Sequence, residues 1–132
     1  MTTTLAGVRR QLEEARVLLG ESAQAAARGE HDPAYRAALR MRNLVFHAER
    51  GLAAARGREL PEMPVVGGKP GGLEDHAPVD AALVSALGVA DDIAEMPAHL
   101  DALKPPLARY LGWLREEVAR QMRAAGSKPV ER

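Results

Sequence analysis

The chain has 132 residues, which is the length of one domain with a core of its own. Apolar residues make up 46% of it and charged residues 27%, which excludes a mainly disordered chain. No apolar run approaches the ~20 residues that a membrane-spanning helix needs. The 18 basic and 18 acidic side chains cancel, so no overall field draws the protein to nucleic acid or anionic lipid. Because there is no cysteine, disulfides, thiol catalysis and cysteine-based metal centres are excluded.

The N-terminal sequence MTTTLAGVRR lacks the apolar segment of a secretory signal. Arginine outnumbers lysine 15 to 3 and alanine is abundant, a bias typical of GC-rich bacterial genomes. We therefore expect a cytoplasmic, bacterial protein.

Helical periodicity dominates the first half of the chain. From Leu5 onward, apolar or small residues recur at spacings of three and four, which predicts a helix over about 4–28. Asp32 and Pro33 suit the N-cap and the first position of a second helix. The apolar stripe that follows predicts this helix over about 33–56.

The second half begins with a segment that has no helical period. Residues 57–78 are rich in proline and glycine, and we predict a long loop there. A third helix is predicted over about 79–96. The pair Pro105–Pro106 forbids a continuous helix but suits the start of a new one, so the fourth helix is predicted over about 106–124.

Four amphipathic helices without a strand signal predict an all-α four-helix bundle that forms a single domain over 1–132, with a frayed tail over 125–132. Many seam positions are alanine and aromatic residues are only 3%, so each seam buries little area. A thin core of this kind often gains stability by dimerising, and we expect a homodimer.

The second helix keeps only a narrow polar strip, which consists of Arg36, Arg40, Asn43, His47 and Arg50. One interpretation is a solvated face whose charges pair with acids of a neighbouring helix, such as Glu13, Glu14 or Glu21. The other is a site in which guanidinium groups hold a phosphate while the imidazole of His47 accepts a proton. The sequence leaves both open.

The stretch RNLVFH within this helix resembles the RxxxxH motif of the HEPN superfamily, small all-α domains that include toxin ribonucleases acting as dimers. Arg42 would match the motif arginine, Asn43 the polar residue after it, and His47 the histidine. The resemblance covers six residues. It implies a metal-independent ribonuclease with His47 as general base and with Arg42, Arg40 and Arg36 on phosphate. On one straight helix Arg42 and His47 diverge by ~140°, so a joint site needs a second chain or a bend.

Three aromatic residues fall outside the helix seams and are candidate binding residues. Trp113 lies beside basic positions of the fourth helix, where it can pack under the loop, cover a dimer face or anchor a partner. Tyr35 and Phe46 form a similar surplus flank on the second helix. We expect self-association through these apolar flanks.

Other chemistries find little support. The four histidines form none of the Glu-x-x-His pairs of bundle metal sites, and Glu74, Asp75 and His76 are too close in sequence to share an ion, so we predict no metal. The segment VVGGKPGG lacks the ending and the preceding strand of a phosphate loop. No cofactor is expected.

The sequence therefore predicts a small helical interaction or regulatory protein that self-associates and binds an unidentified protein partner. The alternative is a HEPN-like ribonuclease or RNA-binding toxin component. A third hypothesis, a small-molecule sensor, has only the long loop in its favour. No membrane is expected to be involved.

Overall fold

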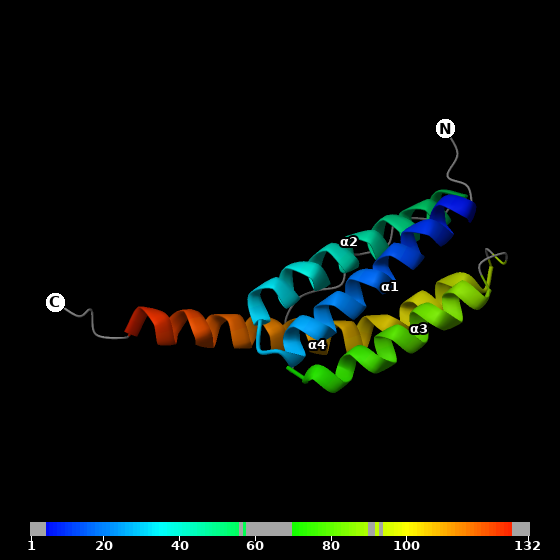
Figure 1. Cartoon of the computed structure of the whole chain (residues 1–132). Helices are drawn as coiled ribbons and strands as arrows, with labels where there is room; N and C mark the ends of the chain where they lie inside the picture. The colour runs from blue at the N-terminus through cyan, green and yellow to red at the C-terminus, as the bar shows by residue number, and fades with distance from the viewer. Residues whose placement is uncertain (1–4, 56, 58–69, 90–91, 93, 128–132) are drawn as a thin grey trace.

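The computed structural model describes residues 5–55, 57, 70–89, 92 and 94–127 and is all-α (Figure 1). Its elements in chain order are α1 (Leu5–Ala27), α2 (His31–Ala55), the 3₁₀ turn η1 (Leu73–Asp75), α3 (His76–Gly88) and α4 (Met96–Ser127). The all-α, four-helix prediction is confirmed, and the described ranges contain no strand. Within them, no helix is both long enough and apolar enough to cross a bilayer.

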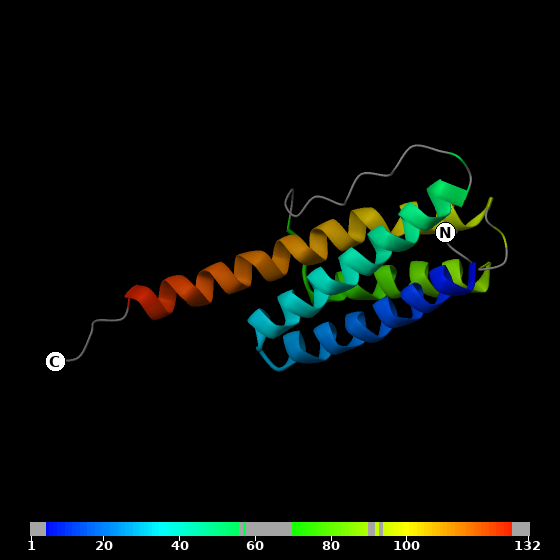
Figure 2. The same cartoon turned by 90° about the horizontal axis from the view of Figure 1, so that it is seen from above.

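The helices form two antiparallel hairpins, α1 with α2 and α3 with α4, which lie side by side (Figure 2). In cross-section α2 neighbours α4, and α3 neighbours α1. Helix α2 ends at one end of the bundle, and α3 begins toward the other (Figure 2). Most of the predicted loop, residues 58–69, lies outside the described residues. At its C-terminal end, residues 73–78 were predicted as loop but form η1 and the start of α3.

The turn of the first hairpin follows from one glycine. Gly29 adopts φ +81°, a left-handed conformation that favours glycine, and the Glu30 N–H bonds to the Ala25 carbonyl at 2.9 Å. The prediction that the first helix stops before Gly29 is confirmed. The Ala34 N–H bonds to the Glu30 carbonyl at 3.2 Å, so α2 begins two residues before the predicted position. Pro33 is tolerated there because the first N–H groups of a helix have no partner inside it.

The break predicted at Pro105–Pro106 is wrong, because α4 runs through both prolines for 32 residues. The third helix correspondingly ends at Gly88 rather than at 96. An interior proline removes a helix hydrogen bond and costs about 3 kcal/mol. Burial offsets that cost here: Leu103 and Leu107 on either side have no exposed surface, and Pro106 is itself buried.

The core runs between the hairpins and consists mainly of leucine and alanine side chains. One buried polar chain crosses it. The Ser22 hydroxyl donates to the Ala34 carbonyl at 2.7 Å, and therefore accepts the Tyr110 O–H, also at 2.7 Å. Ser22 and Tyr110 are both fully buried, so α4 is hydrogen-bonded to α1 and α2 inside the core.

The C-terminal part of α4 extends beyond the other three helices (Figure 2). Its apolar periodicity predicts that Met122 faces the core, but the side chain is 69% exposed. The helix continues to Ser127, past the start of the predicted frayed tail at residue 125; residues 128–132 of that tail lie outside the described residues.

Candidate functional site

The polar strip of α2 is exposed along its whole length, as its periodicity predicts. Three of its residues, Arg40, Asn43 and His47, line a shallow hollow of about 280 Å³ between α1 and α2. The other residues of this hollow are Glu14, Leu18 and Leu44. A guanidinium, an amide and an imidazole therefore border one small depression together with a carboxylate.

The remaining strip residues point elsewhere. The Arg36 guanidinium pairs with Asp32 one turn earlier at 3.1 Å. The Arg50 guanidinium lies over the Phe46 ring at 5.8 Å from its centroid, a cation–π distance. Neither residue borders the hollow.

Arg42 is separate from the hollow. It precedes Glu49 by two helical turns on the same side of α2, the side that contacts α4, and it is half-buried. Among the described residues its Nε atom is buried without a hydrogen-bond partner. The structure therefore does not bring Arg42 and His47 into one site within a single chain.

A buried ion pair joins α2 to α4. Glu49 is only 7% exposed, and its Oε2 lies 3.0 Å from Lys104 Nζ, which also pairs with Asp101 at 3.1 Å. Burial raises the pKa of the Glu49 carboxyl, and the hydrogen bond from Lys104 opposes that rise. For Lys104, burial alone lowers the pKa, but the hydrogen bonds to Glu49 and Asp101 outweigh it and the pKa is raised.

Sequence reasoning missed this pair. The signal is that Glu49 directly follows Ala48 on the apolar side of α2, where a charge needs a partner. The sequence does not say which cation supplies it, because Lys104 is 55 positions away.

Trp113 has an intramolecular role. Its ring is half-buried, stands edge-on to His31 at 5.5 Å and lies 6.0 Å from Tyr110. The Gln121 amide N–H donates to His31 Nδ1 at 2.7 Å, so the neutral imidazole carries its proton on Nε2. Trp113 and Gln121 thus attach the α1–α2 turn to α4.

The other two aromatic candidates are also partly covered. Tyr35 is half-buried and packs against the core, so it is not a free flank. Phe46 is half-buried between its neighbours on α2, with its ring 6.2 Å from that of His47.

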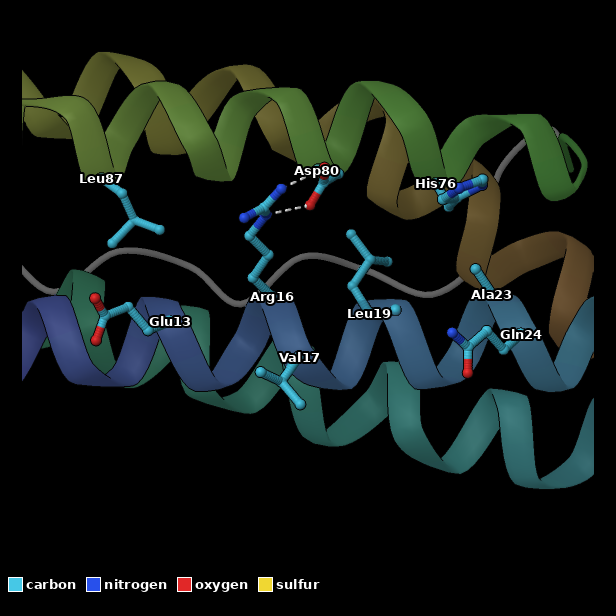
Figure 3. A pocket seen from close by; sticks show the side chains of 10 residues that line it. Glu13, Arg16, Val17, Leu19, Ala23, Gln24, His76, Asp80 and Leu87 are labelled. Carbon is cyan, nitrogen blue, oxygen red and sulfur yellow. Dashed lines mark hydrogen bonds and ion pairs between the residues drawn. The ribbon is translucent and has the colours of Figure 1, made fainter.

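A larger hollow lies between α1 and α3 (Figure 3). We call it the α1–α3 groove; its volume is about 630 Å³, and it is lined by Glu13, Arg16, Val17, Leu19, Gly20, Ala23, Gln24, His76, Asp80 and Leu87. At its middle the Arg16 guanidinium reaches across to Asp80 with two hydrogen bonds, of 2.7 and 3.3 Å. Sequence reasoning did not find this groove, because α1 and α3 are distant in the chain.

The two ends of the groove differ (Figure 3). Glu13 and Leu87 lie at one end, and Gln24 and His76 at the other. His76 Nδ1 lies 2.7 Å from the Leu73 carbonyl, which can only accept, so Nδ1 carries the proton. The groove is thus acidic at one end, and at the other it carries the Gln24 amide N–H as a donor and the His76 Nε2 as an acceptor.

The outer surface of α3 carries no charge. Its one charged residue, Asp80, is already paired with Arg16 across the groove. Val84 on α3 is 46% exposed and Val17 on α1 is 60% exposed. The exposed residues of α3 are Ala77, Pro78, Ala81, Val84, Ser85 and Gly88. Together with the groove they form a largely apolar surface, which we call the α3 face; its centre is neutral because Arg16 and Asp80 are paired, and the Glu13 carboxylate lies at one end.

A fixed turn sets the start of α3. The buried Asp75 carboxylate accepts the Gly72 N–H at 3.0 Å and the Arg109 Nε–H at 3.1 Å. Gly71 bonds to the Arg109 carbonyl, and a Cβ on it would stand 1.7 Å from Asp75 Oδ2. Asp75 is therefore a structural residue. Within the described ranges, no group of three or more histidine, aspartate or glutamate side chains could hold a metal ion.

No family model, no curated protein and no solved structure matches the chain. The function therefore has to be inferred from the surfaces of the molecule. The hollow on α2 offers polar groups for a small anion, and the α3 face offers apolar area for another protein chain.

Proposed function

We propose that the protein is a small helical interaction protein that binds other protein chains, copies of itself included, through the α3 face. The observation that carries this proposal is the absence of unpaired charge from the exposed residues of α3, beside an open groove of about 630 Å³. Contiguous apolar surface with few charges is the property that distinguishes the centre of a protein interface.

The energetics favour a protein partner over solvent. Docking a chain on α3 removes water from alanine, valine and serine side chains, and no ion has to be desolvated without compensation. Val17 and Val84 supply the apolar gain, since complete burial of a valine contributes about 1.5–3 kcal/mol. A groove between two helices suits an amphipathic helix, whose apolar residues recur every three or four positions.

Copurification from the cells that express the protein tests this proposal. Tagged parent protein is compared with Val84→Asp, which places a charge at the centre of the α3 face, and with Ala54→Asp as control. Ala54 is exposed on α2, which does not border the groove. We expect some protein chains to copurify with the parent and with Ala54→Asp but not with Val84→Asp. Identical bound sets for all three proteins would contradict the proposal.

A second candidate function, RNA binding or cleavage of the HEPN type, is favoured by the hollow on α2. An exposed imidazole beside a guanidinium and an amide can hold a phosphate and accept a proton. The Glu14 carboxylate in the same hollow opposes anion binding, and Arg42 would have to come from a second chain.

An RNA cleavage assay tests the second candidate. We expect His47→Ala and Arg40→Ala to abolish cleavage without lowering the melting temperature, because both side chains are exposed. Arg36→Ala, on the same strip but outside the hollow, is the matched control and should remain active. If the parent protein neither binds nor cleaves RNA, this candidate is wrong.

A further inference from the structure

We propose that a second copy of this chain occupies the α1–α3 groove, packed antiparallel about a two-fold axis that passes near the Arg16–Asp80 pair. This inference rests on the proposed function and names the partner of the α3 face. Two observations carry it: the neutral centre of the face, and the different chemistry of the two ends of the groove.

The neutral centre favours a copy of the same chain. At a two-fold axis each residue meets its own copy, so an unpaired charge there would face a like charge. Asp80 is the only charged residue of α3, and Arg16 neutralises it through two hydrogen bonds. Ala81, which is exposed next to this pair, can meet its own copy without electrostatic cost, and Val84 meets the uncharged Pro78 of the other copy.

The ends of the groove favour the antiparallel arrangement. A two-fold axis perpendicular to the helices places the Glu13 end of one copy against the Gln24 and His76 end of the other (Figure 3). The carboxylate then meets the Gln24 amide N–H, which can donate to it. A parallel arrangement would instead place the two Glu13 ends together, with both carboxylates near the Leu87 side chains and without a donor.

The size of the face sets the strength of the contact. The 13 residues of α3 give it a length of about 20 Å, and α1 and α3 side by side are about 20 Å wide. The resulting footprint of about 400 Å² per copy is below the roughly 800 Å² per partner of a standard stable complex. We therefore expect a reversible dimer that dissociates in the micromolar range.

Sedimentation over a range of concentrations is the first test. We expect the mass of the parent to rise from that of the 14.2 kDa monomer toward twice that value. Val17→Asp and Val84→Asp should each weaken association at least tenfold, and Ala54→Asp should behave as the parent. A parent that stays monomeric up to millimolar concentration would overturn the inference.

Disulfide trapping is the second test, and it is clean because the chain has no cysteine. Ala81→Cys, nearest to the axis, should form a covalent dimer on mild oxidation. Ala77→Cys and Ser85→Cys should each stay monomeric alone but cross-link to one another when mixed. Cross-linking of each of these two with itself, and not with the other, would show a parallel arrangement and overturn the inference.

A charge exchange tests the pairing of the ends. Glu13→Lys should weaken the dimer, and the double variant Glu13→Lys/Gln24→Glu should restore it, because the complementary ends are then reversed. Failure of the double variant to recover would contradict the antiparallel pairing. The parent could be monomeric while Val84→Asp still loses bound chains in the copurification. That result would exclude the second copy as the partner but leave the proposed function standing. If Val84→Asp also loses no bound chains, the proposed function is wrong as well.

Discussion

Two regions of the molecule, the first hairpin and α3 with the start of α4, present different chemistry to solvent. Helices α1 and α2 carry six charged residues each, and most of these are exposed. Helix α3 and the first 13 residues of α4 carry three, Asp80, Asp101 and Lys104, and all three are in ion pairs. The formal net charge of zero conceals this division. The absence of unpaired charge therefore distinguishes the centre of the α3 face from the surface of the first hairpin.

The two hairpins are also joined in two different ways. Helix α4 contacts the first hairpin through buried groups, which are the Tyr110–Ser22 hydrogen bond and the Glu49–Lys104 pair. Helix α3 shares the apolar core with α1, and at the surface an open groove, bridged by one exposed ion pair, separates the two helices. We therefore expect substitutions in the α4 contact to change the free energy of unfolding far more than substitutions in the groove.

The largest effect is expected at Tyr110. Tyr110→Ala removes a fully buried ring whose hydroxyl is bonded to Ser22 of α1, and should lower the free energy of unfolding by about 3–5 kcal/mol. Tyr110→Phe keeps the ring and loses only the hydrogen bond to Ser22, at a cost of about 1 kcal/mol. Urea unfolding measures both. Equal costs for the two variants would mean that the ring is not packed as described.

The next largest effect is expected at Lys104. Lys104→Met leaves the Glu49 carboxylate buried without its cation and should cost about 3 kcal/mol near pH 7. The double variant Glu49→Leu/Lys104→Met should recover most of that loss, because it removes the uncompensated charge as well. Recovery that fails would show that the loss in Lys104→Met does not come from an uncompensated charge on Glu49.

The same contact has a defined pH dependence. Because burial raises the pKa of Glu49 above its usual 4.5, the folded state binds the proton more tightly than the unfolded state. The destabilising effect of the ionised carboxylate is therefore relieved as the pH falls through the folded pKa, and is absent below 4.5. We expect the stability difference between the parent and Lys104→Met to shrink from pH 7 toward pH 4.5. A constant difference would contradict this assignment.

The smallest effect is expected in the groove and has the opposite sign. Gly20 lies in the middle of α1, and a Cβ on it would meet nothing within 4 Å. Gly20→Ala should therefore raise the free energy of unfolding by up to about 1 kcal/mol through helix propensity. Gly71→Ala is the contrasting variant, because its Cβ would collide with Asp75 in the turn that precedes α3 and is bonded to α4. Destabilisation by Gly20→Ala would show that α1 and α3 are closer than described.

Local patterns predicted the parts of the fold that depend on neighbouring residues. The stripes of α1 and α2 and the stop at Gly29 follow from spacing and from one glycine. The prediction of a helix break at Pro105–Pro106 was wrong because it took into account only the lost hydrogen bonds. The burial of Leu103 and Leu107 depends on helices far away in the chain, and no local pattern reports it.

The candidate site divides in the same way. Exposure of Arg40, Asn43 and His47 could be read from helical periodicity, and the structure places them around one hollow. Arg42 and His47 could be seen to diverge on the helix, and they do lie apart. Trp113 could not be placed, because its contacts His31 and Tyr110 belong to two different elements.

The sequence by itself determined that the chain is helical, where two of its helices lie and which of their faces are polar, because apolar spacing and glycine act within a few residues. Only the tertiary structure decided which helices meet, since packing joins residues far apart in the chain. It paired Glu49 with Lys104, carried α4 through two prolines and left α1 and α3 apart. The α3 face exists for that reason: a surface is defined by what the fold leaves uncovered.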